Sequence, residues 1–310
     1  MTQPVSPFPV QPELTAIAIG FRNRRLVADQ VMPRVVVGKT VFKWTLFNLV
    51  DGFTVPDTKV GRTSQPNQVE MGGSEQTGAT EDFGLEDPIP LSDIEQAPPG
   101  RNLQMDAAQW LTNLVLLDRE IRVAGKVFNT ANYAAANIKD LAAGEKFSNA
   151  DSDPLTLLTD AMDAMIMRPN VMVIGRKAFS ALARHPKIVK AYHGNDGGSG
   201  IVPAKFIADQ FELEELVVGE AILNTAKKGK TPVLARAWGN HCALHYREIA
   251  AGQGKGPTWG YTAQYGSRVS GSIKDDNIGL RGGVKVRVGE SVAEVVSAPD
   301  LGYLLQNCIA

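Results

Sequence analysis

The stretch NLQMDAAQWLTNLVLLDREIRVAGKVFNT, residues 102–130, shows the clearest periodicity in the chain. Its apolar residues alternate spacings of four and three, which is the pattern of one face of an α-helix. They are Leu103, Ala107, Trp110, Leu114, Leu117, Ile121, Ala124 and Phe128. Leu111, Val115, Leu116 and Val123 widen this face beyond the narrow seam of a coiled coil. The pattern predicts a long helix, roughly 39 Å at 1.5 Å per residue, that lies across a sheet.

The segment before this helix looks extended and poor in side chains that could form a core. VGRTSQPNQVEMGGSEQTGA, residues 60–79, contains only four apolar residues, and EDPIPLSDIEQAPPG, residues 86–100, contains four prolines and predicts no helix. Residues 36–60 alternate weakly and predict strand, and residues 13–33 form an amphipathic segment that Pro33 closes. Such a polar segment cannot offset the entropy of its own ordering, so we expect it to meet a partner.

Charge is distributed unevenly along the N-terminal third of the chain. Residues 1–50 carry six basic and two acidic side chains, whereas residues 51–100 carry two basic and ten acidic ones. Opposite signs predict that the two segments meet, within one chain or between neighbouring chains, although two solvated surfaces would give the same pattern. The residues expected at such an interface are Arg22, Arg24, Arg25, Lys59, Arg62, Glu70, Glu75, Glu81 and Asp82.

The C-terminal half predicts a compact lobe of short helices and strands. DSDPLTLLTDAMDAMIM, residues 151–167, predicts a helix with Asp153 as its N-cap, Pro154 at its first position and Pro169 as its end. NVMVIG, residues 170–175, predicts a buried strand, and the last 30 residues also have the composition of strands. Residues 194–200 and 251–266 are rich in glycine and predict loops. The fold class is therefore α+β.

Bulk composition excludes several classes of protein. The chain has 310 residues, of which 44% are apolar, so it can form two globular lobes. A net charge of −1 argues against a general affinity for nucleic acid. Cys242 and Cys308 are too few for a disulfide framework and favour a reducing compartment. The N-terminal residues do not form a signal peptide, and no apolar run is long enough to span a membrane.

The sequence contains only weak matches to the motifs of catalytic, nucleotide-binding and metal-binding sites. The tripeptide GKT occurs twice, but the first glycine of a phosphate-binding loop is replaced by Pro33 in one case and by Asn224 in the other. HCALH brings His241 and His245 close in sequence, but in a strand they would stand about 13 Å apart. Cys242 and His241 would then point to opposite faces, which excludes a Cys–His nucleophile. We therefore predict no enzyme, no cofactor and no metal site.

Several segments of the sequence resemble the tailed-phage major capsid proteins of the Hong Kong 97-like fold. Residues 13–44 resemble the N-terminal arm of that family, residues 51–71 and 81–90 resemble its extended loop, and DREIRVAGKVFNTANY (118–133) is similar to the end of its spine helix. Residues 170–192 and 213–232 are similar to strand–helix and strand–turn phrases of its axial domain. The resemblance covers nearly the whole chain.

The resemblance implies a division of the chain and a set of partners. It implies an N-terminal arm (1–37), an extended loop (38–100), a spine helix with part of the peripheral domain (101–150), a mainly axial domain (151–270) and C-terminal strands (271–310). Such a protein would self-assemble into hexamers and pentamers of an icosahedral shell around double-stranded DNA, with no sequence specificity and no membrane. Its other partners would be a scaffolding protein, a portal and decoration proteins. The expected location is the virion, after assembly in the host cytoplasm.

Two alternatives stay open at this point. An encapsulin-type compartment would use the same fold to enclose a protein cargo. A metal-dependent enzyme centred on His241 and His245 is the other alternative. Some members of the fold cross-link neighbouring chains through a lysine of the extended loop, and Lys59 lies in that region. Nothing identifies its asparagine partner, so we do not carry that chemistry over.

Overall fold

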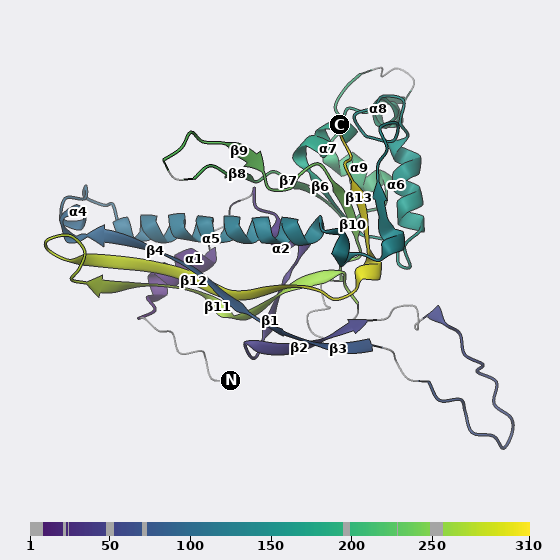
Figure 1. Ribbon diagram of the computed structural model, residues 1–310, viewed down its shortest axis with the longest axis horizontal. Helices are drawn as coiled ribbons and strands as arrows, with labels where there is room; N and C mark the ends of the chain where they lie inside the picture. Colours follow the sequence, from purple (N-terminus) through teal and green to yellow (C-terminus); the bar gives the residue numbers. More distant parts are fainter. Residues whose placement is uncertain are drawn as a thin grey trace.

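The computed structural model describes residues 9–20, 23, 25–47, 53–69, 73–194, 199–227, 229–248 and 257–310. In this part of the chain, one long helix crosses an elongated four-stranded sheet, and a lobe built on a five-stranded sheet lies at one end of the helix (Figure 1). The mixture of helices and separate sheets confirms the predicted α+β class.

The elongated sheet combines strands from three regions of the sequence. Its order is β1 (Arg34–Val37), β11 (Gly260–Asp275), β12 (Gly283–Val296) and β4 (Glu81–Pro90). β1 runs parallel to β11, and the other pairs are antiparallel. Gly260 begins a strand here, so the prediction of a loop over residues 251–266 was wrong for residues 260–266.

The proline-rich segment before the long helix is more regular than predicted. Pro88 and Pro90 lie in β4, which is an edge strand, where a missing N–H is tolerated on the open side. A short helix, α4 (Leu91–Glu95), follows directly, which corrects the prediction of no helix before Gly100.

The long helix is α5 (Leu103–Val127), 25 residues, which confirms the predicted element. The Asn102 side chain caps it by accepting hydrogen bonds from the Gln104 and Met105 amides. Its buried face differs from the predicted one, because Trp110 is 56% exposed and Ile121 is 39% exposed. The residues that α5 buries are Ala107, Ala108, Leu111, Thr112, Val115, Leu116, Arg119, Glu120, Val123, Ala124 and Val127.

The lobe is a five-stranded sheet flanked by four short helices. The strand order is β5 (Ile138–Asp140), β13 (Gly302–Gln306), β10 (Cys242–His245), β6 (Val171–Gly175) and β7 (Glu215–Gly219). The helices are α6 (Pro154–Asp163), α7 (Arg176–Leu182), α8 (Pro186–His193) and α9 (Ala204–Gln210). Asp153 caps α6 as predicted, but the helix ends at Asp163 rather than at Pro169. β6 is buried along its whole length, as its sequence indicated.

The remaining elements are short and mostly N-terminal. Helices α1 (Pro12–Gly20) and α2 (Ala28–Val31) pack against α5. Two hairpins complete the described structure, β2 (Val41–Phe47) with β3 (Gly73–Ala79), and β8 (Ile222–Asn224) with β9 (Leu234–Arg236). Single 3-10 turns cover Thr130–Asn132, Ala135–Asn137 and Pro299–Leu301.

Four apolar clusters hold the described parts together, and the smallest joins Phe42 of β2 to Ala263 and Val295 of the elongated sheet. The first fills the lobe between its sheet and helices α6–α9. The second lies where α2 and the C-terminal half of α5 meet the lobe sheet, and it contains Trp238 and Trp259. The third lies between α1, the N-terminal half of α5 and strand β12. The N-terminal helices are thus part of the core of this chain, and α5 connects all the layers.

Candidate functional site

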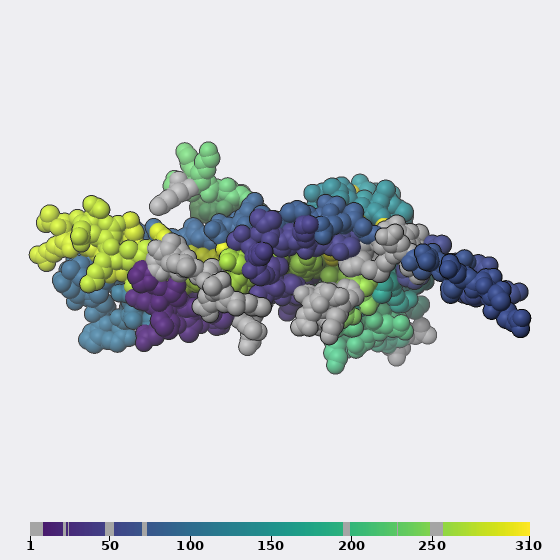
Figure 2. Space-filling model, turned by 90° about the horizontal axis from the view of Figure 1, so that it is seen from below, coloured from purple at the N-terminus to yellow at the C-terminus, as the bar shows by residue number. Residues whose placement is uncertain are grey.

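The segment from residue 53 to 69 projects away from the body of the chain (Figures 1 and 2). Every residue in it is exposed, including the apolar Phe53, Val55, Val60 and Val69. Val55 is 86% exposed. Its hydrogen bonds include ones within the segment itself, such as the 2.8 Å bond that the Asn67 side-chain amide donates to the Asp57 backbone carbonyl. Apolar side chains displayed on an extended segment of this kind are typical of a surface that another chain covers.

Hairpin β2–β3 supports this projecting segment at its base. The Trp44 ring lies over Gly78, where a Cβ would come within 2.6 Å of it, and Phe42 anchors the hairpin to the sheet beside Ala263. Lys43 pairs with Glu75 across the two strands at 2.5 Å. The hairpin therefore joins the basic N-terminal region to the acidic region inside one chain.

The predicted interface residues are dispersed over several surfaces. Arg22, Arg24 and Glu70 lie outside the described residues. Arg25 is exposed before α2, and Lys59 and Arg62 are exposed on the projecting segment. Glu75 lies on hairpin β2–β3, and Glu81 and Asp82 are exposed on edge strand β4, where Asp82 accepts a hydrogen bond from Ser291. The fold of one chain does not bring the six described residues of this set into one site.

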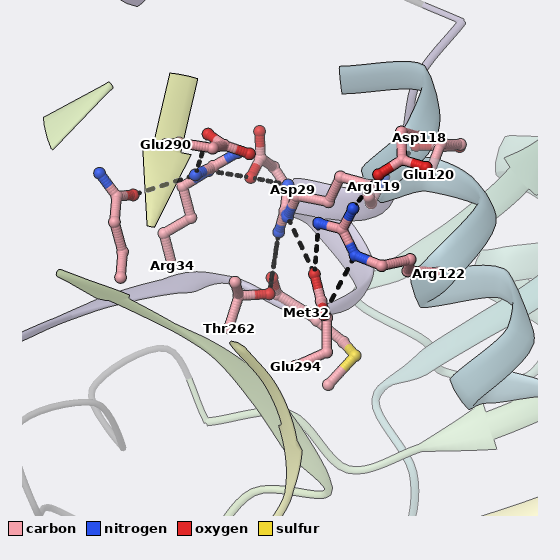
Figure 3. Close-up of polar contacts among 12 residues, drawn as sticks. Asp29, Met32, Arg34, Asp118, Arg119, Glu120, Arg122, Thr262, Glu290 and Glu294 are labelled. Carbon is pink, nitrogen blue, oxygen red and sulfur yellow. Dashed lines mark hydrogen bonds and ion pairs between the residues drawn. The ribbon is translucent and has the colours of Figure 1, made fainter. Parts of the chain in front are cut away.

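A buried polar clamp, built around Arg119, ties the N-terminal residues 27–34 to α5 and to the sheet (Figure 3). The Arg119 side chain is 1% exposed. It donates hydrogen bonds to the Asp29 carboxylate at 2.6 Å, to the Met32 carbonyl at 3.1 Å and to the Thr262 hydroxyl at 2.9 Å. A guanidinium offers several donors in a fixed plane, so one side chain holds α2, the turn after it and strand β11 at once.

Arg34 and Glu290 extend the clamp along the sheet. Arg34 donates to Glu290 at 2.8 Å and to Asp29 at 2.8 Å, and Arg268 donates to Glu290 at 3.2 Å. Burial raises the pKa of Glu290, but the nearby guanidinium groups outweigh burial and hold it below its ordinary value. Glu290 is therefore ionised and paired at neutral pH.

Glu120 forms a second part of the clamp, directed at the lobe. Its carboxylate accepts hydrogen bonds from the Val27 amide at 2.9 Å, the Ala28 amide at 2.8 Å and the Trp238 indole at 2.6 Å. Burial raises its pKa, and these hydrogen bonds lower it in part. One side chain of α5 thus caps α2 and positions a tryptophan that belongs to the lobe.

Sequence reasoning missed Arg119 and Glu120, although a signal for them was present. They fall four residues after Val115 and Leu116, on the set of apolar residues that widened the helix face. Charged residues at those positions had to be buried if that set faced the core. The alternative stripe through Trp110 and Ile121 contained no charge and looked like the better core face.

The histidines of HCALH are structural. His245 is buried in β10, stacks on Trp259 with ring centroids 3.9 Å apart, and shares a 2.8 Å hydrogen bond with the Tyr133 hydroxyl. Burial lowers its pKa to about 3, so it is neutral. The Nδ1 atom of His241 accepts a hydrogen bond from the Asn307 amide. Among the described residues, no group of three histidine, cysteine or acidic side chains is placed to hold a metal ion.

Comparisons with known proteins agree with this geometry. A family model described as phage major capsid protein E matches residues 103–224. A major capsid protein of Pseudomonas phage JBD67 is 52% identical over 305 residues, which cover 98% of this chain and 99% of that one. The major capsid protein of Burkholderia phage BcepMu is 31% identical over 96% of both chains. A crystal structure of a phage-related protein from Bordetella bronchiseptica RB50 has a TM-score of 0.74 at 22% identity, covering 96% of this chain and 97% of that chain.

The chain belongs to the family of phage major capsid proteins. Its fold is the Hong Kong 97-like capsid fold that the sequence phrases indicated.

Membership in the phage major capsid proteins favours the phage shell over the encapsulin alternative. A subunit of a phage shell is a structural component of the virion and associates with copies of itself. The encapsulin alternative is less supported, because the 52% identical relative over nearly the full length is a phage capsid protein.

Cys242 and Cys308 are both free and buried, and burial raises the pKa of Cys308 to about 12. No helix among the described residues is long and apolar enough to cross a membrane.

Proposed function

We propose that this capsid protein forms the icosahedral shell of a tailed phage as hexamers and pentamers, with segment 53–69 lying over a neighbouring subunit. The exposure of that whole segment, including its four apolar side chains, is the observation that carries the proposal. Phe53, Val55, Val60 and Val69 leave water only when another chain covers them. Residues 1–37 form the arm and residues 38–100 the extended loop of this arrangement, except that strands β1 and β4 pair into the four-stranded sheet.

The two parts of the fold correspond to two positions in a capsomer. Helix α5 and the four-stranded sheet form the peripheral domain, which makes contacts around the edge. The lobe of residues 151–248 with β13 forms most of the axial domain, which meets its copies at the centre. Strand β11 pairs with β1 and β12, so residues 260–270 go with the peripheral sheet. The glycine-rich residues 194–200, of which 195–198 lie outside the described residues, are the candidate for adapting to five or six neighbours.

The partners of the shell follow from its chemistry and its family. The near-neutral chain encloses double-stranded DNA without a sequence-specific grip, because strong attraction would hinder packing and release. A scaffolding protein, a portal and decoration proteins complete the set, and assembly takes place in the host cytoplasm. The chain does no chemistry of its own in this role.

Electron microscopy of the chain, expressed alone and then with the products of the neighbouring genes, tests the proposal. Icosahedral shells, tubes or capsomer rings are expected. A monomer under all of these conditions would show that the proposal is wrong. Val55→Asp should reduce the yield of particles, because a charge on this side chain cannot be buried under a neighbour. Thr58→Asp is the matched control, since it adds the same charge to an exposed polar position of the same segment.

Charge reversal tests the pairing of the arm with the acidic region. Changing Arg22, Arg24 and Arg25 together to glutamate should impair assembly and leave the folded subunit intact. Each exposed pair contributes about 0–1 kcal/mol, but the same contacts recur in every subunit of the shell. Shells of normal yield and shape from this triple variant would refute the pairing.

A further inference from the structure

Helix α5 carries an apolar stripe that lies mostly outside its own core, although Leu117 also packs against the second apolar cluster. Trp110, Leu114, Leu117 and Ile121 are spaced by four, three and four residues, so they share one helix face. Trp110 is 56% exposed and Ile121 is 39% exposed, and the two leucines between them are only partly buried. The core side of α5 is a different set that contains Leu111, Val115 and Val123. A stripe three turns long is larger than the scattered apolar residues of an ordinary surface.

Hairpin β8–β9 is a second apolar surface with no cover in its own chain. It stands out from the body of the protein (Figure 2, green). Ile222 is 44% exposed, Val233 57% and Leu234 70%. Register pairs Ile222 with Arg236 and Asn224 with Leu234, so Ile222 and Leu234 lie diagonally on the same face of the hairpin. Two strands alone are marginally stable in water, which makes a partner surface valuable.

The two surfaces are complementary in charge as well as in hydrophobicity. The hairpin sequence, residues 222–236, contains four basic residues and no acidic one. Residues 81–122, which form β4, α4 and most of α5 including the stripe, contain nine acidic residues and three basic residues. Asp106 and Asp118 lie on α5 itself, four residues before Trp110 and four residues after Leu114, and they pair with Arg101 and Arg122, so the net acidic charge comes mainly from β4 and α4. A basic hairpin with an apolar face therefore matches an apolar stripe in acidic surroundings.

We propose that hairpin β8–β9 of one subunit docks on the Trp110–Ile121 stripe of a second copy of the chain. The proposal rests on the proposed function and names one contact within it. The docking surfaces are different patches of the same chain, so the contact is heterologous and repeats head to tail. A head-to-tail contact closes into a ring when its rotation fits, which is the geometry that hexamers and pentamers need.

Site-directed cross-linking between two chains tests this contact. One preparation carries Trp110→Cys and the other, with a different tag length, carries Leu234→Cys; the two are assembled together and oxidised mildly. Each chain has one new thiol, so a cross-linked species of mixed tags can arise only between subunits. The native Cys242 and Cys308 are buried with raised pKa values and should not react. Ile201→Cys replaces Leu234→Cys in the control, because Ile201 is 71% exposed on the same lobe but outside the hairpin.

Mixed-tag dimers should form with a yield about tenfold above that of the Trp110–Ile201 control pair, since adjacency raises the effective thiol concentration. Particles that assemble without the Trp110–Leu234 cross-link would overturn the docking contact and leave the shell function standing. Equal yields from the two pairs would also overturn it, because they would indicate random collision. Failure of the unmodified chain to form any particle, both alone and with the products of the neighbouring genes, would refute the shell function itself, and the docking contact with it.

Discussion

Replacing Glu120 with glutamine should destabilise the unassembled subunit, because an amide cannot accept the three hydrogen bonds that the carboxylate accepts. Oε1 receives the Val27 amide and the Trp238 indole, and Oε2 receives the Ala28 amide. If the glutamine oxygen takes the place of Oε1, its NH₂ group faces the Ala28 N–H, donor against donor. α2 would then lose part of its cap, and the indole would keep only a neutral acceptor.

The size of the effect follows from this geometry. One buried donor left without a partner costs about 1–3 kcal/mol. The two retained hydrogen bonds become roughly half as strong, because the acceptor is no longer ionised. Removing a desolvated charge acts in the opposite direction, because burial of Glu120 raises its pKa and disfavours its charged form. We expect a net loss of about 2 kcal/mol for Glu120→Gln and about 4 kcal/mol for Glu120→Ala, which leaves all three donors unsatisfied.

Urea unfolding of dissociated subunits, followed by tryptophan fluorescence, measures these losses. Glu95→Gln is the matched control, because Glu95 is exposed on α4 and its substitution should change the free energy of unfolding by less than about 0.5 kcal/mol. Hydrogen exchange adds a local readout, since the Val27 and Ala28 amides should exchange faster in the variant. Two Glu120 variants as stable as the wild type, with unchanged exchange at these amides, would refute the assignment of Glu120 as a structural node.

Three further changes test other parts of the fold. The pKa of Glu290 lies below its ordinary value of 4.5, so its pairing with Arg34 stabilises the subunit at neutral pH, and this stabilisation is lost as the pH falls below about 4.5. Glu290→Gln should therefore lower the free energy of unfolding at pH 7. It should also make that free energy depend less on pH in the acid range. Gly219→Ala should cost about 3 kcal/mol in urea unfolding, because its Cβ would lie 2.0 Å from the Trp238 ring. Gly125→Ala, in α5 with nothing within 4 Å of the added Cβ, should instead raise stability by about 0.5–1 kcal/mol.

The sequence predicted individual helices and strands better than it predicted which strands pair and which side chains are buried. The α5 periodicity, the Asp153 cap and the buried β6 strand were all local patterns, and the structure confirms them. β4 was missed because its prolines are acceptable only at a sheet edge, and edge position depends on partners far along the chain. The start of β11 was missed for a similar reason, since its glycines looked like loop residues until β12 and β1 paired with them.

The error over the buried face of α5 was the most informative one. Both stripes of the helix are apolar, so periodicity alone could not say which one faces the core. The chain buries the stripe that contains Arg119 and Glu120 and exposes the stripe that contains Trp110. Glu120 accepts hydrogen bonds from the Val27 and Ala28 amides. Arg119 donates to the Asp29 carboxylate and the Met32 carbonyl, and its Nε atom lies 4.0 Å from the Glu294 carboxylate.

For a protein that stayed alone in solution, a charged core side and an apolar outer side would be a poor arrangement of one helix. Burial of charges is costly unless each is paired, and exposed apolar stripes promote association. Both features become favourable in a subunit that must hold its own N-terminal residues firmly and also offer a surface to the next copy. The Arg119–Glu120 clamp meets the first requirement through directional hydrogen bonds, and the Trp110–Ile121 stripe meets the second through apolar area. The face of α5 that carries Arg119 and Glu120 therefore serves the folding of the subunit, and the face that carries the Trp110–Ile121 stripe serves its assembly.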